Sequence, residues 1–146
     1  VLGSRGLGDV YKRQLICMAL LILPQLADEK PLFAGAQSYL FYTRSASSQA
    51  QIVHATPENA AYIRLSLFDR TGESAFFDRA EDAFAQAEIY GARLLFTEKA
   101  GDVTNYYYYS PRLGECVLLS GQAVNLHIAL RGESGCAGSP LIFGGY

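Results

Sequence analysis

The chain has 146 residues, a formal net charge of −2 and a hydrophobic fraction of 50%, which suits one domain with a real core and is too little for two. The mild acidity and the lack of a basic cluster argue against nucleic acid or an anionic membrane surface as a partner. Neither G-x-S-x-G nor H-E-x-x-H occurs, which excludes these two hydrolase signatures. We expect no metal and no cofactor.

Residues 4–14, SRGLGDVYKRQ, look at first like a glycine-rich phosphate loop. A dinucleotide-binding loop needs a preceding strand, and a P-loop ends in Gly-Lys-Ser/Thr, whereas this stretch ends in Lys12-Arg13-Gln14. The stretch instead resembles, without a mismatch, the in-frame translation of a transposase adaptor used in sequencing libraries. We therefore expect residues 1–14 to be adaptor-derived and disordered.

Residues 15–26, LICMALLILPQL, form a short apolar run followed by polar residues. The run is shorter than a bilayer span and fits the central part of a secretory signal peptide, with a buried N-terminal helix as the alternative. Residues 15–36 are thus predicted to be a truncated signal peptide or anchor plus a linker, processed near Ala34 or Ala36. The protein would then be secreted, or anchored outside the cytoplasm and in contact with the membrane only through this segment.

Residues 37–146 are expected to form a single α+β domain. Its first part predicts a hairpin of strands at 38–43 and 51–55 with a polar turn at 45–49. Thr56 and Pro57 are typical of a helix start, here of only a turn or two. Alternating apolar residues then predict a half-buried strand at 63–68, and a returning strand follows at 74–77.

The strongest helix signal lies at residues 79–90. Asp78 and Glu81 have the spacing of a capping box, and apolar residues follow at helical intervals. Gly91 stands where a left-handed C-cap belongs. The sequence therefore predicts one main helix at about residues 79–90.

Beyond Gly91 the pattern predicts strands joined by short turns. They are expected at residues 92–97, 103–110, 116–119, 123–131 and 139–143, with a tight turn at Ser120-Gly121 and a loop at 132–138. Within 123–131, Val124, Leu126, Ile128 and Leu130 would face the core and their neighbours would face out. The result is an α+β fold, a largely antiparallel sheet of about 6–8 strands with the main helix packed on one face.

The candidate site residues lie on the predicted outward face of these strands. His127 is either a general base or ligand, or an exposed sheet histidine without a chemical role. In the run Tyr106–Tyr109 alternate rings go to opposite faces, and the outward pair would form an aromatic platform or simply pack across the sheet. No catalytic residue is assigned, and the candidate binding surface comprises Asn105, Tyr107, Tyr109, Asn125, His127 and Arg131.

Cys116 and Cys136 are the candidates for a bridge in an exported domain, and their spacing fits no zinc pattern. A disulfide and a free, partly buried pair are both open.

Three stretches carry a family resemblance: Tyr109-Ser110-Pro111, VNLHIALR at 124–131, and GSPLI at 138–142. They resemble the C-terminal part of the YwmB family of bacterial exported proteins. The resemblance spans residues 106–131 and 138–146 and is weak before Arg79. It implies an extracytoplasmic protein of unknown biochemical activity, with an α+β fold like that of the TATA-box-binding protein, and it supplies no catalytic residues.

Two functions follow from these observations. The first is a non-enzymatic binding or structural module of the cell envelope, of the YwmB type, whose partner is an envelope ligand or protein. The alternative is a cell-wall-active hydrolase that uses His127 with a carboxylate such as Glu115. A pocket that brings His127 next to an acid would favour the enzyme, and a flat face would favour the module.

Overall fold

The structure is a computed structural model, and it describes residues 2–27, 30–44 and 51–144. The chain forms two compact units, Val1–Lys30 and Pro31–Tyr146. The predicted turn at residues 45–49 lies outside the described residues.

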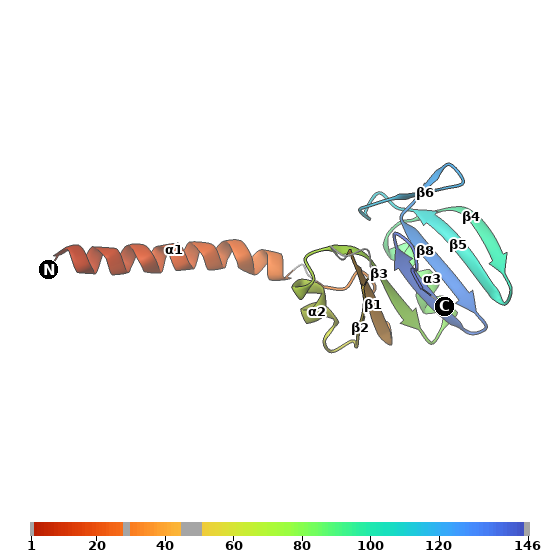
Figure 1. Cartoon of the computed structure of the whole chain (residues 1–146), viewed down its shortest axis with the longest axis horizontal. Helices are drawn as coiled ribbons and strands as arrows, with labels where there is room; N and C mark the ends of the chain where they lie inside the picture. Colours follow the sequence, from red (N-terminus) through yellow and green to blue (C-terminus); the bar gives the residue numbers. More distant parts are fainter. Residues whose placement is uncertain (1, 28–29, 45–50, 145–146) are drawn as a thin grey trace. The chain divides into compact units, whose positions relative to one another are not determined.

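The first unit is one helix, α1 (Leu2–Ala27) (Figure 1). Contrary to the predicted disorder of residues 1–14, residues 2–14 are helical. Residues 9–16 hold no glycine or proline, so a helix in the apolar run can extend to residue 9 at little cost, whereas the glycines at residues 3, 6 and 8 do not explain the helix before it. Gly6 and residues 8–22 are exposed. Within the described residues, no helix is both long enough and apolar enough to cross a bilayer.

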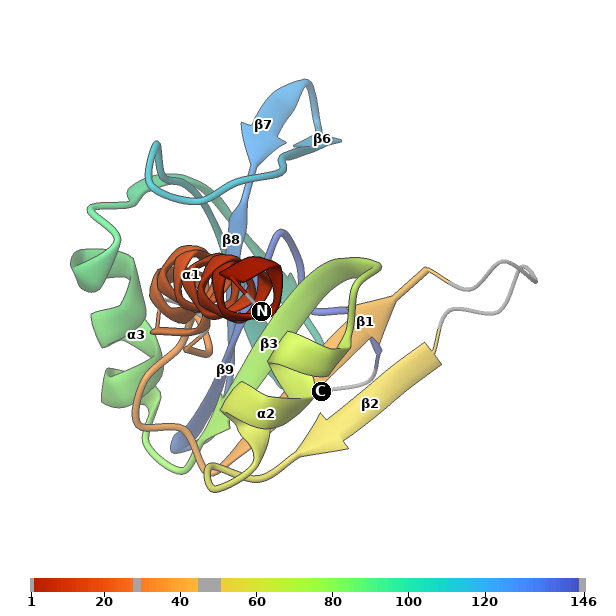
Figure 2. The ribbon, with the colours of Figure 1, turned by 90° about the vertical axis from the view of Figure 1, so that its left-hand side faces the viewer.

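The second unit contains, among its described residues, an antiparallel sheet of seven strands. The strands are β1 (Ser38–Thr43), β2 (Gln51–Ala55), β3 (Arg70–Phe77), β4 (Arg93–Ala100), β5 (Val103–Tyr109), β8 (Leu126–Arg131) and β9 (Ser134–Ser139). Their order across the sheet is β2-β1-β3-β9-β8-β5-β4 (Figures 1 and 2). The predicted α+β class with a largely antiparallel sheet is confirmed.

Two short strands, β6 (Val117–Leu119) and β7 (Gln122–Val124), form a separate ribbon. Its turn has positive φ at both central residues, 49° at Ser120 and 75° at Gly121, as a tight type I′ hairpin requires. The predicted turn is therefore confirmed. The predicted strand at 123–131 is divided, because β7 pairs with β6 and β8 joins the main sheet.

Helix α3 (Ala80–Ile89) packs on one side of the sheet, which we call the first face. Gly91 has a φ of 56° and its N–H bonds back to the helix, so the predicted left-handed end is confirmed. The predicted capping box is wrong, because Arg79 is the N-cap residue and makes no side-chain cap bond. The backbone carbonyl of Glu133 instead accepts the Ala80 N–H at 2.7 Å and so satisfies one of the free N–H groups of the first turn.

Helix α2 (Ala60–Ser66) occupies most of the segment that was predicted to be a strand at 63–68, and that prediction is wrong. The helix begins at Ala60, not at Pro57. Ile63 and Leu67 pack against the core at helical spacing from Ala60, whereas Leu65 is 38% exposed. A short apolar segment fits both periods, and here the helical set is the one that reaches the core.

Strand β9 lies where a loop was predicted, and the strand predicted at 139–143 is absent from the described sheet. The sequence of β9, SGCAGS, has none of the large or β-branched residues that indicate a strand. Small residues are needed because α3 crosses β9 closely. A Cβ added at Gly135 would lie 2.6 Å from the Cβ of Ala83.

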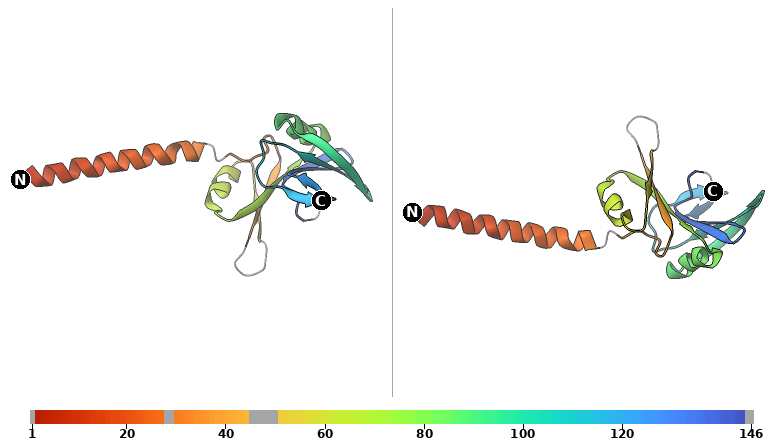
Figure 3. Two further views of the ribbon diagram at one scale, coloured as in Figure 1. Left: turned by 90° about the horizontal axis from the view of Figure 1, so that it is seen from above. Right: turned by 90° about the horizontal axis from the view of Figure 1, so that it is seen from below.

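After β9 the chain folds back over the opposite side of the sheet, the second face. Figure 3 shows this C-terminal segment and α3 on opposite sides of the sheet. A Cβ at Gly138 would lie 2.7 Å from Cγ1 of Ile142, and one at Gly72 would lie 2.8 Å from the carbonyl oxygen of Ser139. Residues 139–142 therefore pack directly on the bare backbone of β9 and β3, which requires glycine at both positions.

Residues 31–36, predicted to be a linker, belong to the core instead. Phe33 is 0% and Ala36 is 6% exposed. The carboxylate of Glu73 accepts the Leu32 N–H, and the Tyr90 hydroxyl donates to the Leu32 carbonyl. The compact domain thus begins at Pro31 and not at residue 37.

Candidate functional site

The tyrosine run of β5 divides between the two faces of the sheet as predicted. Tyr106 packs edge-to-face on Phe84 of α3, with ring centroids 4.9 Å apart, and Tyr108 is buried in the same core. Tyr107 pairs with His127 across β5 and β8 and therefore stands on the second face. Tyr109 lies two residues on and shares that face.

Tyr107 is the middle ring of a stack that crosses three strands. Its ring lies 4.6 Å from Phe96 on β4 and 4.6 Å from His127 on β8, with interplanar angles of 25° and 16°. Because β5 lies between β4 and β8, the two partners cover opposite faces of the tyrosine ring. Tyr107 consequently offers no free ring face on which a sugar or base could stack.

His127 is buried, with 8% exposure, so the prediction of an exposed histidine is wrong. Its Nδ1 accepts the backbone N–H of Ile142 at 3.3 Å, and its Nε2 lies 3.0 Å from Oδ1 of Asn105. Since Nδ1 is the acceptor, Nε2 carries the proton and donates it to Asn105. Burial lowers the pKa of His127 from 6.5 to about 4, so the ring is neutral near pH 7.

The misplacement of His127 has a non-local cause. The alternating pattern of β8 correctly places Leu126 and Ile128 on the first face, where both are fully buried. His127 and Ala129 of the outward set are buried as well, because the C-terminal segment returns over them, whereas Arg131 at the end of the strand is exposed. Nothing in the sequence of β8 itself indicates this second cover.

Asn125 is fully buried and belongs to no open surface, contrary to the prediction. Its Oδ1 accepts the Ser110 N–H at 2.7 Å, and its Nδ2 donates to the carbonyls of Ser110 at 2.7 Å and Leu113 at 3.3 Å. Asn125 therefore fixes the loop that follows β5. This role explains a polar residue at the junction of β7 and β8.

Three of the predicted residues meet in one polar hollow on the second face. Its volume is about 280 Å³, and Asn105, His127 and Arg131 supply its polar side chains, while Ile142 and Gly144 form part of its wall. Arg131 also pairs with Asp102, with 3.3 Å between Nε and Oδ2. Tyr109 lies elsewhere, in a hollow with Arg93 and Gln122.

Among the described residues that line this hollow there is no acid of the kind that the hydrolase hypothesis would need. Glu115 lines a different depression together with Glu73 and Arg64. Glu73 is itself engaged, with its Oε2 2.8 Å from Nε of Arg64. The polar hollow thus brings together an amide, a neutral imidazole and a guanidinium, a set suited to hydrogen bonding.

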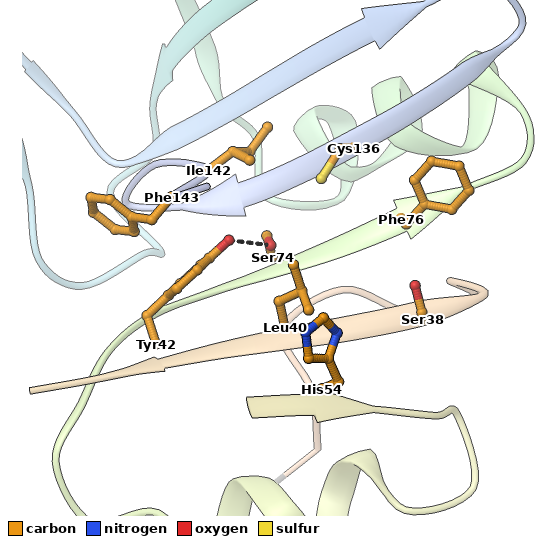
Figure 4. A pocket seen from close by; sticks show the side chains of 9 residues that line it. All are labelled: Ser38, Leu40, Tyr42, His54, Ser74, Phe76, Cys136, Ile142 and Phe143. Carbon is orange, nitrogen blue, oxygen red and sulfur yellow. Dashed lines mark hydrogen bonds between the residues drawn. The ribbon is translucent and has the colours of Figure 1, made fainter. Parts of the chain in front are cut away.

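A second hollow on the same face was not predicted from the sequence. It is an apolar cavity of about 210 Å³ beside Ile142, shown in Figure 4. Its wall is made by Ser38, Leu40, Tyr42, His54, Ser74, Phe76, Cys136, Ile142 and Phe143. These residues come from β1, β2, β3, β9 and the C-terminal segment, so no local motif could have indicated the cavity.

The cysteines are free in the structure, and the bridge between Cys116 and Cys136 is not formed. Cys116 is exposed and Cys136 is buried. Burial raises the pKa of the Cys136 thiol to about 12. In the described part of the chain, no group of three or more histidine, cysteine or acidic side chains could hold a metal ion.

Comparison of the chain with protein-family models, with curated proteins and with solved structures found no match. The relation to the YwmB family therefore stays a proposal.

Proposed function

We propose that the chain is a non-enzymatic binding module that works outside the cytoplasm, with the second face of the sheet as its working surface. The second face is hollowed, whereas the module hypothesis had expected it to be flat, but no acid stands beside His127 in the described lining of its hollow. The observation that carries this proposal is the pair of hollows on that face, one polar and one apolar, which share Ile142 as a wall. A binding site needs a concave surface with a few convergent polar groups, and both hollows provide them.

The state of His127 supports binding over catalysis. A general base needs a free lone pair directed at the substrate and a pKa near the working pH. Here the lone pair of Nδ1 is taken by the backbone of Ile142, and burial lowers the pKa to about 4. The hydrogen-bond partner of Nε2 is an amide and not a carboxylate.

The proposed location rests on the apolar run at 15–26 and on the resemblance of residues 106–146 to the YwmB family. The partner would accordingly be an envelope ligand or protein. The likeness of the fold to the TATA-box-binding protein is part of the same proposal and concerns shape alone.

The proposal is tested by incubating the full chain with soluble peptidoglycan fragments and following both binding and turnover. We expect no turnover. Turnover that is lost in His127→Gln, while the melting curve and the activity of Glu88→Gln stay unchanged, would establish the hydrolase instead. Glu88 is the control because it is exposed on α3, which covers the first face, and lines neither hollow.

A further inference from the structure

The apolar cavity on the second face opens to solvent at a rim where Ser38 and His54 are exposed, and its inner wall includes the buried Tyr42, Ser74 and Cys136. At about 210 Å³ this cavity exceeds the size of an engineered cavity of about 150 Å³ that binds benzene. It therefore has room for one small ring with a substituent.

The walls of the cavity are aromatic and aliphatic. Tyr42 and Phe143 meet edge-to-face, with ring centroids 5.1 Å apart and planes at 80°. Figure 4 shows Phe76 and Leu40 lying along the neighbouring strands, with Ile142 on the C-terminal segment. Ring edges and faces set at these angles suit an aromatic guest.

A short line of polar groups forms the floor. The hydroxyls of Tyr42 and Ser74 are 2.9 Å apart (Figure 4), and the thiol of Cys136 lines the same cavity. Both serine and tyrosine hydroxyls can donate and accept, so the line can take one further hydrogen bond from a guest.

Among the described residues, no acidic, lysine or arginine side chain lines this cavity, and its one histidine, His54, lies at the exposed rim. An ionised guest would lose its hydration without gaining a partner of opposite charge, which is costly in an apolar site. These walls therefore favour a neutral occupant over an ionised one.

We propose that this cavity binds a small uncharged aromatic molecule that carries one hydrogen-bonding group, of the phenol type. The ring lies against Tyr42, Phe76 and Phe143, and its polar group joins the hydroxyls of Tyr42 and Ser74. The inference rests on the proposed function in taking the second face as the working surface, and it names the ligand class for one of its two hollows.

The test uses the full chain with 4-methylphenol as the probe and benzoate as a charged comparator of nearly the same size. Methyl NMR follows Leu40 in the cavity wall and Leu118, which is 75% exposed on β6. We expect a saturable shift at Leu40 and none at Leu118, with a Kd between about 10 µM and 1 mM, as a ligand of this size allows. Benzoate should bind at least about tenfold more weakly.

Two variants fill the cavity and one control fills the other hollow. Cys136→Leu enlarges a side chain of the floor, and Ser38→Leu, at an exposed position of the rim, serves if the first variant does not fold. Each should weaken 4-methylphenol binding at least about tenfold by occupying its space. Ala100→Leu, in the wall of the polar hollow, should leave the affinity unchanged.

The inference is overturned if Leu40 shows no saturable shift up to about 10 mM 4-methylphenol, a range that includes millimolar affinity. It is equally overturned if benzoate binds as well, or if the filled variants bind as the wild type does. Turnover of peptidoglycan fragments would overturn the proposed function and would not affect the binding of 4-methylphenol to the cavity. Failure of 4-methylphenol to bind would overturn only the present inference.

Discussion

One buried side chain on the second face, His127, makes the stability of the domain depend on pH. The pKa of His127 is about 4 in the folded chain and about 6.5 when it is unfolded. Between these values the unfolded state binds a proton that the folded state does not. The contribution of His127 to the free energy of unfolding is therefore completely present above about pH 6.5. It is lost as the pH drops towards 4, which lowers the free energy of unfolding by up to about 3 kcal/mol.

Urea unfolding of the full chain at pH 7, 5.5 and 4.5 measures this loss. We expect His127→Gln to lose less stability than the wild type over the same range, because glutamine does not titrate. His54→Gln, at an exposed position, should follow the wild type. If the free energy of unfolding fell equally with pH in His127→Gln and in the wild type, the histidine would not be buried as described.

Asn125 offers a second prediction for a single side chain. Asn125→Ala should lower the free energy of unfolding by about 2–4 kcal/mol, because it leaves the buried N–H of Ser110 without a partner and leaves the Ser110 carbonyl only the long bond from the Leu113 N–H at 3.4 Å. Chemical denaturation gives the value directly. Gln122→Ala, at an exposed position of β7, is the matched control and should change stability by less than about 0.5 kcal/mol. If Asn125→Ala cost as little as the control, the hydrogen bonds of Asn125 would not fix the loop that follows β5.

At the scale of elements, the contact between α3 and β9 depends on two small residues. Gly135→Ala should cost about 1–3 kcal/mol, since the new Cβ would lie 2.6 Å from that of Ala83. Ala83→Gly in the same chain should restore part of this loss, although glycine within a helix costs about 1 kcal/mol. A double-mutant cycle measures the coupling, and additive effects would show that the helix does not cross there.

Gly114→Ala is the control for this cycle. No atom lies within 4 Å of a Cβ added at Gly114, and its φ is not in the left-handed region. The substitution should be neutral or slightly stabilising, because it restricts the unfolded chain.

The same elements show how far the sequence could predict this fold. Helix α3 and strand β5 were found because their periodicity is set by one buried face, which a local pattern records. The turn at Ser120-Gly121 was found because its backbone conformation selects the residue types. Strand β9 was missed because its small residues are required by the close packing of α3 across it. That packing is a tertiary contact, which no local sequence pattern records.

The candidate site was predictable to a similar extent. Asn105, His127 and Arg131 were grouped correctly, since strand alternation puts them on one face. The burial of His127 and the apolar cavity could not be foreseen, because both depend on the C-terminal segment folding back over Gly138 and Gly72.

At the scale of the whole molecule, the boundary of the domain is the feature most open to test. A chain of residues 31–146 should fold and unfold cooperatively, because this unit contains the entire buried cluster around Phe33, Phe41 and Phe77. A chain of residues 37–146 should melt at least about 10 °C lower or fail to fold. It lacks Phe33, whose loss alone costs about 3–5 kcal/mol out of a total of about 5–15 kcal/mol.

Differential scanning calorimetry of the two chains decides between the boundaries, with Phe33→Ala in the longer chain as the matched control. That variant should fall between the two, because it keeps the hydrogen bonds of Leu32 to Glu73 and Tyr90. Equal melting of both chains would restore the boundary at residue 37 and make residues 31–36 a linker. If the longer chain is the more stable, a cut after Ala34 or Ala36 would remove Phe33 from the core, so processing at either position would destabilise the domain.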